Sequence, residues 1–364
     1  MILHLYIARR FFKAFLIVLL TLSGIYMLLD AVENIRKFGA SIGFVEISHL
    51  TALKLPGAMY QLMPLLAILA TLLLFLSLSR SSEMVVTRAA GRPALLTLMA
   101  PAAVVLVIGL IGLMVINPIV AATSSEYSRL TSRLSGADSS VLSVSKEGLW
   151  LRQGDANGQT VIRAQSSSAD GLVLYEAAFF SFSRTGTPLS RINAREARLE
   201  EGRWALREAK IWDFRDLSNP EQNAHRTKRY WIATTLTPER IRGSLDEPSA
   251  IPIWEMPAFI DQLEQAGFSP RRHQVWFQTE LASPLFLVAM VLLGAAFTMR
   301  HTRLGQTGLM ALIALLFGFG IYFIRNFATI LGENGQIPVL VAAWTPPVAA
   351  MFLALGIILN LEDG

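Results

Sequence analysis

A short charged segment at residues 81–91, between two long apolar stretches, carries the first candidate for a binding role. Glu83 and Arg88 supply charge and Met84 supplies an apolar contact, at spacings that suit a compact helix closed by Gly91. A carboxylate on such a helix can accept a charge-assisted hydrogen bond from a basic residue of another protein. We therefore expect Glu83, Met84 and Arg88 to contact a partner. The alternative is a helix that lies on a membrane surface and exposes its charges to water.

Two adjacent cations, Arg36 and Lys37, form the second candidate site. They follow the first long apolar stretch, where a basic side chain meets headgroup phosphates with little loss of hydration. Asp30 and Glu33 stand one or two helical turns earlier and could pair with the same cations. The sequence thus favours phosphate binding by Arg36 and Lys37, with neutralisation by the neighbouring carboxylates as the alternative.

The residues that several other kinds of chemistry require are missing. None of the lysines follows a glycine, so the phosphate-binding loop of nucleotide hydrolases is absent. The chain has no cysteine, and its five histidines are scattered without the spacing of metal ligands. No DNA- or RNA-binding motif accompanies the net charge of +5. We expect no enzymatic activity, no metal site, no nucleic-acid partner and no cofactor bound by this chain.

Composition identifies the elements that must position the candidate residues. Of the 364 residues, 53% are hydrophobic and only 16% are charged, against about 25% charged in an average soluble domain. The apolar residues gather in stretches of about 19 to 25, long enough for a helix to cross a hydrocarbon core of about 30 Å. The predicted membrane helices span residues 11–29, 55–79, 94–116, 281–299, 304–324 and 337–361. Carboxylates are absent from these six stretches, which disfavours a carrier driven by protons.

The short loops between the predicted helices indicate their orientation. Basic residues concentrate before the first helix, between the second and third, and between the fourth and fifth: Arg9, Arg10, Lys13, Arg80, Arg88, Arg92, Arg300 and Arg303. Loops rich in Lys and Arg stay in the cytoplasm. We therefore predict that both termini are cytoplasmic and that the long polar middle of the chain lies on the outer side.

The polar middle of the chain reads as a β domain. Short runs of alternating apolar residues are separated by turn signals, as in residues 148–153, 160–164, 172–183 and 204–214. Such runs are typical of an antiparallel sandwich, jelly roll or open barrel, and an amphipathic helix at 254–266 follows them. We predict an α-helical integral membrane protein with six transmembrane helices and an inserted all-β, jelly-roll-like domain. Its parts are residues 1–123, with the short helix at about 81–91, then 124–272 and 273–364.

Short motifs along the whole chain resemble one family of membrane proteins. Residues 60–64 (Tyr-Gln-Leu-Met-Pro), 82–86 (Ser-Glu-Met-Val-Val) and 90–91 (Ala-Gly) are similar to the permease family LptF/LptG, also called YjgP/YjgQ. Further matches lie at 117–118, 146–152, 236–239, 337–338 and 344–346. Each motif is weak alone, and the combination is specific. Residues 148–150 (Gly-Leu-Trp) favour the LptG branch of the family.

The resemblance implies a lipopolysaccharide exporter in the bacterial inner membrane. In this family an LptF-like and an LptG-like chain pair, and a dimer of an LptB-like cytoplasmic ATPase drives them with ATP and Mg. Lipopolysaccharide leaves the outer leaflet and passes to a periplasmic bridge that begins with an LptC-like protein. The resemblance further implies that Glu83, Met84 and Arg88 couple to the ATPase. It also implies that Arg36 and Lys37 contact lipid A phosphates and that the β domain is a periplasmic jelly roll.

Two other functions fit part of the sequence. A membrane scaffold could present the β domain to a partner without transporting anything, although six helices exceed what anchoring needs. A mechanotransmission subunit of an ABC complex could move an outer domain without conducting lipid, although such subunits use fewer helices. Co-purification with a cytoplasmic ATPase would separate the scaffold from the transporter.

Overall fold

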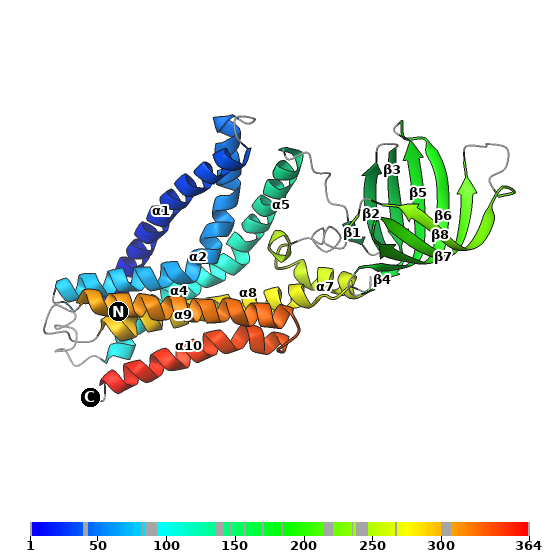
Figure 1. The fold of residues 1–364 in the computed structure, drawn as a ribbon. Helices are drawn as coiled ribbons and strands as arrows, with labels where there is room; N and C mark the ends of the chain where they lie inside the picture. The colour runs from blue at the N-terminus through cyan, green and yellow to red at the C-terminus, as the bar shows by residue number, and fades with distance from the viewer. Residues whose placement is uncertain are drawn as a thin grey trace. The chain divides into compact units, whose positions relative to one another are not determined.

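The protein is described from a computed structural model, and Figure 1 shows its fold. The described residues are 2–38, 43–81, 83, 93–134, 142–145, 148–155, 158–168, 171–183, 185–214, 221–234, 236–237, 247–265, 268–299 and 307–362. The chain divides into two compact units. The first contains Met1–Tyr127, Ser249–Ile253 and Arg271–Gly364, and the second contains Ser128–Pro248 and Trp254–Pro270.

The first unit is a bundle of long helices. In chain order these are α1 (Ile2–Phe38), α2 (Phe44–Arg80), α4 (Ala94–Ile111), α5 (Asn117–Leu134, of which the residues after Tyr127 belong to the second unit), α8 (Arg271–Thr298), α9 (Thr307–Glu333) and α10 (Val339–Glu362). A π-helical turn at Gly112–Ile116 joins α4 to α5, so the two form one continuous helix. Counted this way, six helices in the described part of the chain are long and apolar enough to cross a membrane, which confirms the prediction.

Most of these helices are longer than the sequence predicted. The predicted stretches stop at the first charged residues, but a helix continues wherever its backbone hydrogen bonds can form. The fourth membrane helix shows the consequence, because α8 begins at Arg271 and not at residue 281. Glu280 therefore lies inside a membrane-spanning helix, as does Asp30 in α1. Glu33, Glu46, Glu126 and Glu333 also lie in these longer helices, but all six carboxylates are outside the predicted apolar stretches, which contain none.

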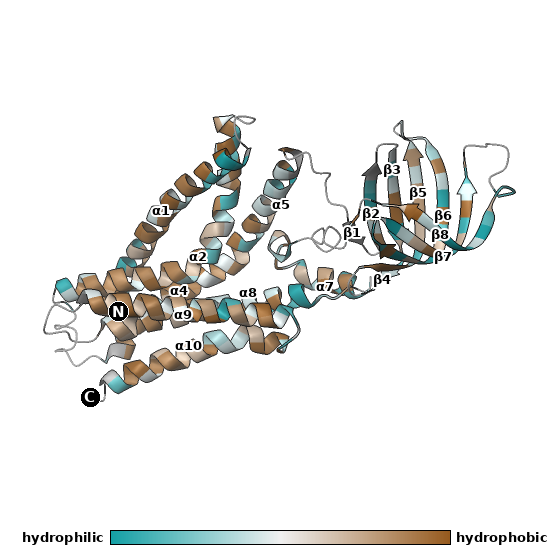
Figure 2. Ribbon diagram, in the orientation of Figure 1, coloured by the Kyte–Doolittle hydropathy of each residue, from teal (hydrophilic) through white to brown (hydrophobic). Residues whose placement is uncertain are grey.

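The bundle is packed around α2 and α8. Two-thirds (67%) of the most apolar window of each is buried, against 17% for α1 and for α9. Close approach is local: a Cβ atom added to Gly109 of α4 would lie only 2.9 Å from Cα of Pro284 in α8. Figure 2 shows the apolar colouring continuing along the outer helices. The apolar faces of α1 and α9 are thus available to lipid or to another chain.

The second unit is built on one antiparallel sheet. Its strands are β1 (Leu142–Ser145), β2 (Gly148–Asp155), β3 (Gly158–Ala164), β4 (Ser166–Ser167), β5 (Val173–Ser183), β6 (Pro188–Glu200), β7 (Arg203–Asp213) and β8 (His225–Ala233). Their order is β1-β2-β3-β5-β6-β7-β8, with β4 paired to β5. The central β region is therefore confirmed, and its strands follow one another as a meander.

A row of irregularities bends the sheet around its apolar side. The alternation of buried and exposed residues breaks at residues 175–176 in β5, 195–196 in β6 and 207–208 in β7. Glu176 and Glu208 have positive φ angles of 49° and 52°, and the strand pairing skips them without a change of register. The bend encloses Trp204 and Phe179, whose ring centres are 6.1 Å apart. Leu263 of α7 (Met256–Gln265) is fully buried in the same cluster.

The boundaries of the two units differ slightly from the predicted divisions at 123 and 273. α5 continues through Leu134, so residue 123 falls within a helix. The polar residues in the second half of α5 end the apolar pattern of the sequence, but they do not end the helix. The short stretch Ser249–Ile253 belongs to the helical unit, because the backbone N–H of Ile253 donates to Oδ1 of Asn117 at 3.0 Å.

Candidate functional site

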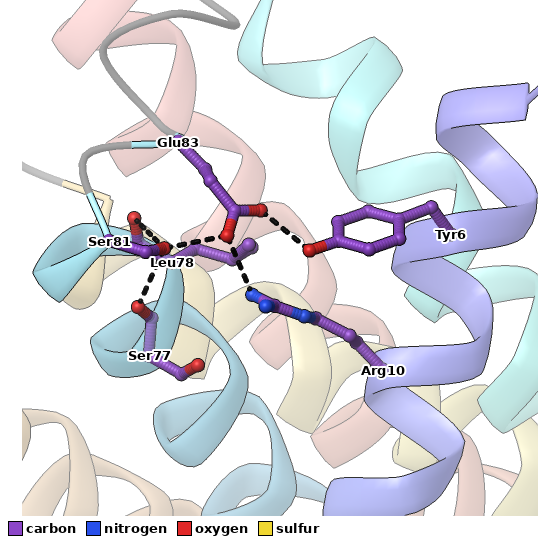
Figure 3. A network of polar contacts seen from close by, with 6 residues as sticks. All are labelled: Tyr6, Arg10, Ser77, Leu78, Ser81 and Glu83. Carbon is purple, nitrogen blue, oxygen red and sulfur yellow. Dashed lines mark hydrogen bonds and ion pairs between the residues drawn. The ribbon is translucent and has the colours of Figure 1, made fainter.

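The carboxylate of Glu83 is held between the end of α2 and the start of α1 (Figure 3). Its Oε2 accepts a hydrogen bond from the Tyr6 hydroxyl at 2.9 Å, and its Oε1 lies 3.1 Å from Nη1 of Arg10. The Ser81 hydroxyl donates to Oε1 at 2.8 Å. Both oxygens are thus engaged within one chain, while about a third of the side chain (34%) stays exposed.

The local sequence explains why these groups meet. Just beyond α2, the backbone N–H of Ser81 donates to the carbonyl of Ser77 at 3.1 Å, while the Ser81 hydroxyl donates to Glu83. Tyr6 and Arg10 are one helical turn apart, so they lie on the same face of α1. Cζ of Arg10 is 4.9 Å from the centre of the Tyr6 ring. The two side chains therefore present a phenol and a guanidinium together to one carboxylate.

These contacts determine the charge of Glu83. Partial burial acts to raise the pKa of Glu83, but hydrogen bonds from Ser81 and Tyr6 and the charge of Arg10 outweigh it, so the pKa falls below its ordinary value. Glu83 is therefore an anion at neutral pH. The exposed third of the side chain can still be reached by a donor from another protein.

The rest of the predicted 81–91 helix, including Met84 and Arg88, lies outside the described residues. The sequence predicts an external partner for Glu83, whereas the contacts that the structure describes come from Tyr6, Arg10 and Ser81 of the same chain. Sequence reasoning misses Tyr6, and it uses Arg10 only as evidence of orientation. Their four-residue spacing on one helix was the available signal.

At the other end of α1, Asp30 is tied to α2. Its side chain is only 2% exposed, and its Oδ1 lies 2.8 Å from Nζ of Lys54. Its Oδ2 accepts a hydrogen bond at 2.8 Å from Nδ2 of Asn34, which also donates to the Thr51 hydroxyl at 3.2 Å. Four side chains from two helices thus form one polar cluster that fixes this end of α1 against α2.

Arg36 and Lys37 occupy the last turn of α1, and both side chains are exposed. The sequence left open whether Asp30 neutralises them, but the Asp30 carboxylate is engaged by Lys54 instead. Within the ranges that the structure describes, no carboxylate forms an ion pair with Arg36. Because both side chains are exposed, an anion from outside the chain can reach them.

A third polar group lies within the membrane-spanning helices. Glu280 of α8 is buried, with 8% exposure, and accepts a hydrogen bond from the hydroxyl of Tyr60 in α2. The charge of Arg325 in α9 acts on Glu280, and Cζ of Arg325 lies 4.8 Å from the centre of the Phe286 ring. An acidic and a basic side chain are thus brought to the same part of the helical unit, where a membrane interior favours partners for ionisable groups. Sequence reasoning placed Glu280 outside its predicted helix and therefore missed this group.

Comparison with known proteins decides the family. Residues 5–360 match the family described as "Lipopolysaccharide export system permease LptF/LptG". The chain belongs to the LptF/LptG family. The lipopolysaccharide export system permease protein LptG of Escherichia coli K12 is 23% identical over 366 residues, covering 99% of this chain and 98% of that protein. LptG of Haemophilus influenzae is 22% identical over 345 residues, covering 94% of this chain and 93% of that protein.

Membership of the LptF/LptG family confirms the resemblance seen in the motifs, and both of these relatives are LptG proteins. The chain is a permease component of the lipopolysaccharide export system and not itself the catalytic ATPase. With its six spanning helices it is a multi-pass protein of the inner membrane. Among its described residues, no three His, Asp or Glu side chains gather as metal ligands.

Proposed function

We propose that this LptF/LptG permease is the transmembrane subunit of an ABC transporter that extracts lipopolysaccharide from the outer leaflet of the inner membrane. The observation that carries the proposal is the arrangement of α1. Its first turns meet the anionic Glu83, and its last turn carries the exposed cations Arg36 and Lys37. One end suits coupling to an ATPase, and the other suits binding of a phosphorylated lipid that is then passed to a periplasmic bridge.

The orientation belongs to the proposal. The Arg-rich loops favour cytoplasmic termini, a cytoplasmic Glu83 and a periplasmic sheet unit. Because the native chain has no cysteine, single cysteines at position 83 and at the exposed position 201 can be labelled separately. A reagent confined to the periplasm should label position 201 only. Labelling of position 83 alone would reverse the proposed orientation.

The proposed partners are an LptF-like paralogue, a dimer of an LptB-like cytoplasmic ATPase and an LptC-like periplasmic bridge protein. The poorly buried faces of α1 and α9 support contact with a second membrane chain or with lipid, since only 17% of each apolar window is covered. ATP and Mg would be used by the ATPase, and no cofactor or nucleic acid by this chain. Together the partners would close and open a cavity for the acyl chains.

Coupling to the ATPase is assigned to Glu83, Met84 and Arg88. Glu83→Gln removes the charge but keeps the shape of the side chain, so it should weaken recovery of the ATPase or reduce lipopolysaccharide release per ATP. Glu201→Gln, an exposed change in a turn of the sheet unit, is the matched control. Normal ATPase recovery and normal release by Glu83→Gln in reconstituted vesicles would contradict the assignment. Absence of any ATPase from the native preparation would favour the scaffold function.

Substrate binding is assigned to Arg36 and Lys37. Each cation near a membrane surface contributes about 1 kcal/mol toward an anionic lipid, so reversing both charges should weaken lipopolysaccharide binding severalfold or more. Photo-crosslinkers at positions 36 and 37 test the contact directly. Adducts with lipopolysaccharide support the assignment. Adducts with neighbouring protein or bulk phospholipid alone would remove both residues from the site, and a complex that hydrolyses ATP without lipid release would favour mechanotransmission.

A further inference from the structure

α1 is held to the rest of the helical unit along its first half and again at Asp30, and only weakly between these two regions. Its buried apolar residues lie in the first half, from Ile7 to Val18. Between Val18 and Asp30 no side chain is buried, and Leu20 and Leu28 are 70% and 72% exposed. The second half is therefore held chiefly by the polar cluster around Asp30.

α1 is also a continuous rod. Its 37 residues contain no proline, whereas α2 contains Pro56 and Pro64. At 1.5 Å per residue such a helix is about 55 Å long, and without proline it has no built-in hinge. A displacement at Tyr6 and Arg10 is consequently carried along the helix and not absorbed within it.

The connection at the first end is polar and specific. Glu83 Oε2 accepts from Tyr6, and Oε1 faces Arg10, so both oxygens that an ATPase could pull on are already attached to α1 (Figure 3). Ser81 attaches the same carboxylate to the end of α2. Any movement of Glu83 must therefore either carry the start of α1 with it or break two contacts.

We propose that Tyr6 and Arg10 are positioning residues that join Glu83 to α1, so that displacement of Glu83 by an ATPase moves the last turn of α1 and its two cations. This inference rests on the proposed coupling role of Glu83. The inference adds that movement driven by the ATPase reaches the substrate-binding end through α1, the helix that bears Arg36 and Lys37. The Asp30 cluster then serves as the pivot of α1, and the last turn of the helix moves about it.

The experiment follows the last turn of α1 without using substrate. In the cysteine-free chain, nitroxide labels at Ile35→Cys and Val45→Cys report the separation between the end of α1 and the start of α2, since both positions are exposed (50% and 78%). The full complex with its ATPase is measured in proteoliposomes, before and after trapping with ATP and vanadate. When Tyr6 and Arg10 are intact, trapping should change the distribution of distances between the two labels.

The double variant Tyr6→Phe/Arg10→Gln removes the hydroxyl donor and the charge. It should reduce that change and lower lipopolysaccharide release per ATP by about threefold or more, because two partly exposed polar contacts shift an equilibrium by that order. Arg10→Lys keeps a cation opposite Glu83, so it should show most of the native distance change that the double variant loses. Arg9→Gln, which neutralises the exposed neighbour, is the matched control and should behave as the native protein.

Each result decides the matter. An unchanged distance response and unchanged release in Tyr6→Phe/Arg10→Gln, or no response in the native complex, overturns the inference and leaves the proposed function standing. Failure of the native chain to assemble with any ATPase overturns both. Loss of response in the double variant and in Arg9→Gln alike would point to general damage and reject a specific role for Tyr6 and Arg10.

Discussion

Asp30→Asn tests whether a buried ion pair fixes one end of α1. The carboxylate is 2% exposed and meets Nζ of Lys54 at 2.8 Å and Nδ2 of Asn34 at 2.8 Å. The change preserves the shape of the side chain and one carbonyl acceptor, but it removes the negative charge. Lys54 then keeps its charge with no carboxylate opposite it.

The magnitude follows from the exposure of the two partners. Removing one member of a fully buried pair costs about 3–5 kcal/mol, and an exposed pair contributes about 0–1 kcal/mol. Lys54 is 37% exposed, so water can solvate the abandoned ammonium group in part. We therefore expect a loss of about 1–3 kcal/mol in the free energy of unfolding of the helical unit. For a unit of roughly 200 residues this lowers the apparent melting temperature by several degrees.

The assay is thermal unfolding of the detergent-solubilised full chain. Glu33→Gln is the matched control, since Glu33 is an exposed carboxylate three residues further along the same helix, and it should change stability by no more than about 0.5 kcal/mol. In Asp30→Asn/Lys54→Gln the effects should be less than additive, because both changes remove the same interaction. Equal melting temperatures for Asp30→Asn and Glu33→Gln, or strict additivity in the double variant, would refute the reasoning.

Further outcomes follow from single packing and charge contacts. A Cβ atom at Gly332 would lie 2.6 Å from Cβ of Ala342, so Gly332→Ala should destabilise the contact of α9 with α10 by about 1–3 kcal/mol. A Cβ atom at Gly320 would have nothing within 4 Å, so Gly320→Ala should cause no such loss. Thermal unfolding of the two variants tests the difference. Trp204→Ala should cost the sheet unit about 3–5 kcal/mol, seen as faster limited proteolysis. Trp204→Phe should cost less, because the buried indole N–H of Trp204 has no hydrogen-bond partner among the described residues. Hydrogen bonds from Lys210 and Trp212 lower the pKa of Glu221 below its ordinary 4.5. The contribution of Glu221 to the stability of the sheet unit is therefore present above that pH and is lost on acidification below it. Glu221→Gln should make stability fall less steeply at acid pH, and an unchanged fall would contradict this.

The parts of the candidate site that the sequence revealed are those with a local signature. Arg36 and Lys37 stand out because they follow an apolar stretch, and Glu83 because it lies on a short charged segment between two such stretches. Their partners have no local signature. Tyr6 is 77 residues from Glu83, and Lys54 is 24 residues from Asp30, so only the packing of α1 against α2 brings each pair together. The sequence offered Arg36 and Lys37 as partners of Asp30 because they were near in the chain.

Sequence alone determined the six membrane helices and the β unit, because both follow from short-range patterns. A stretch of apolar residues must form a helix to satisfy its backbone in lipid, and alternating residues form a sheet with one buried face. The tertiary structure decided where the helices end and which polar groups meet. α8 reaches back to Arg271 and buries Glu280 against Tyr60, which no window of apolar residues could show. The physical reason is that hydrophobic burial is set by composition along the chain, whereas a hydrogen bond or ion pair needs two particular atoms within about 3 Å, and only the packed bundle provides that.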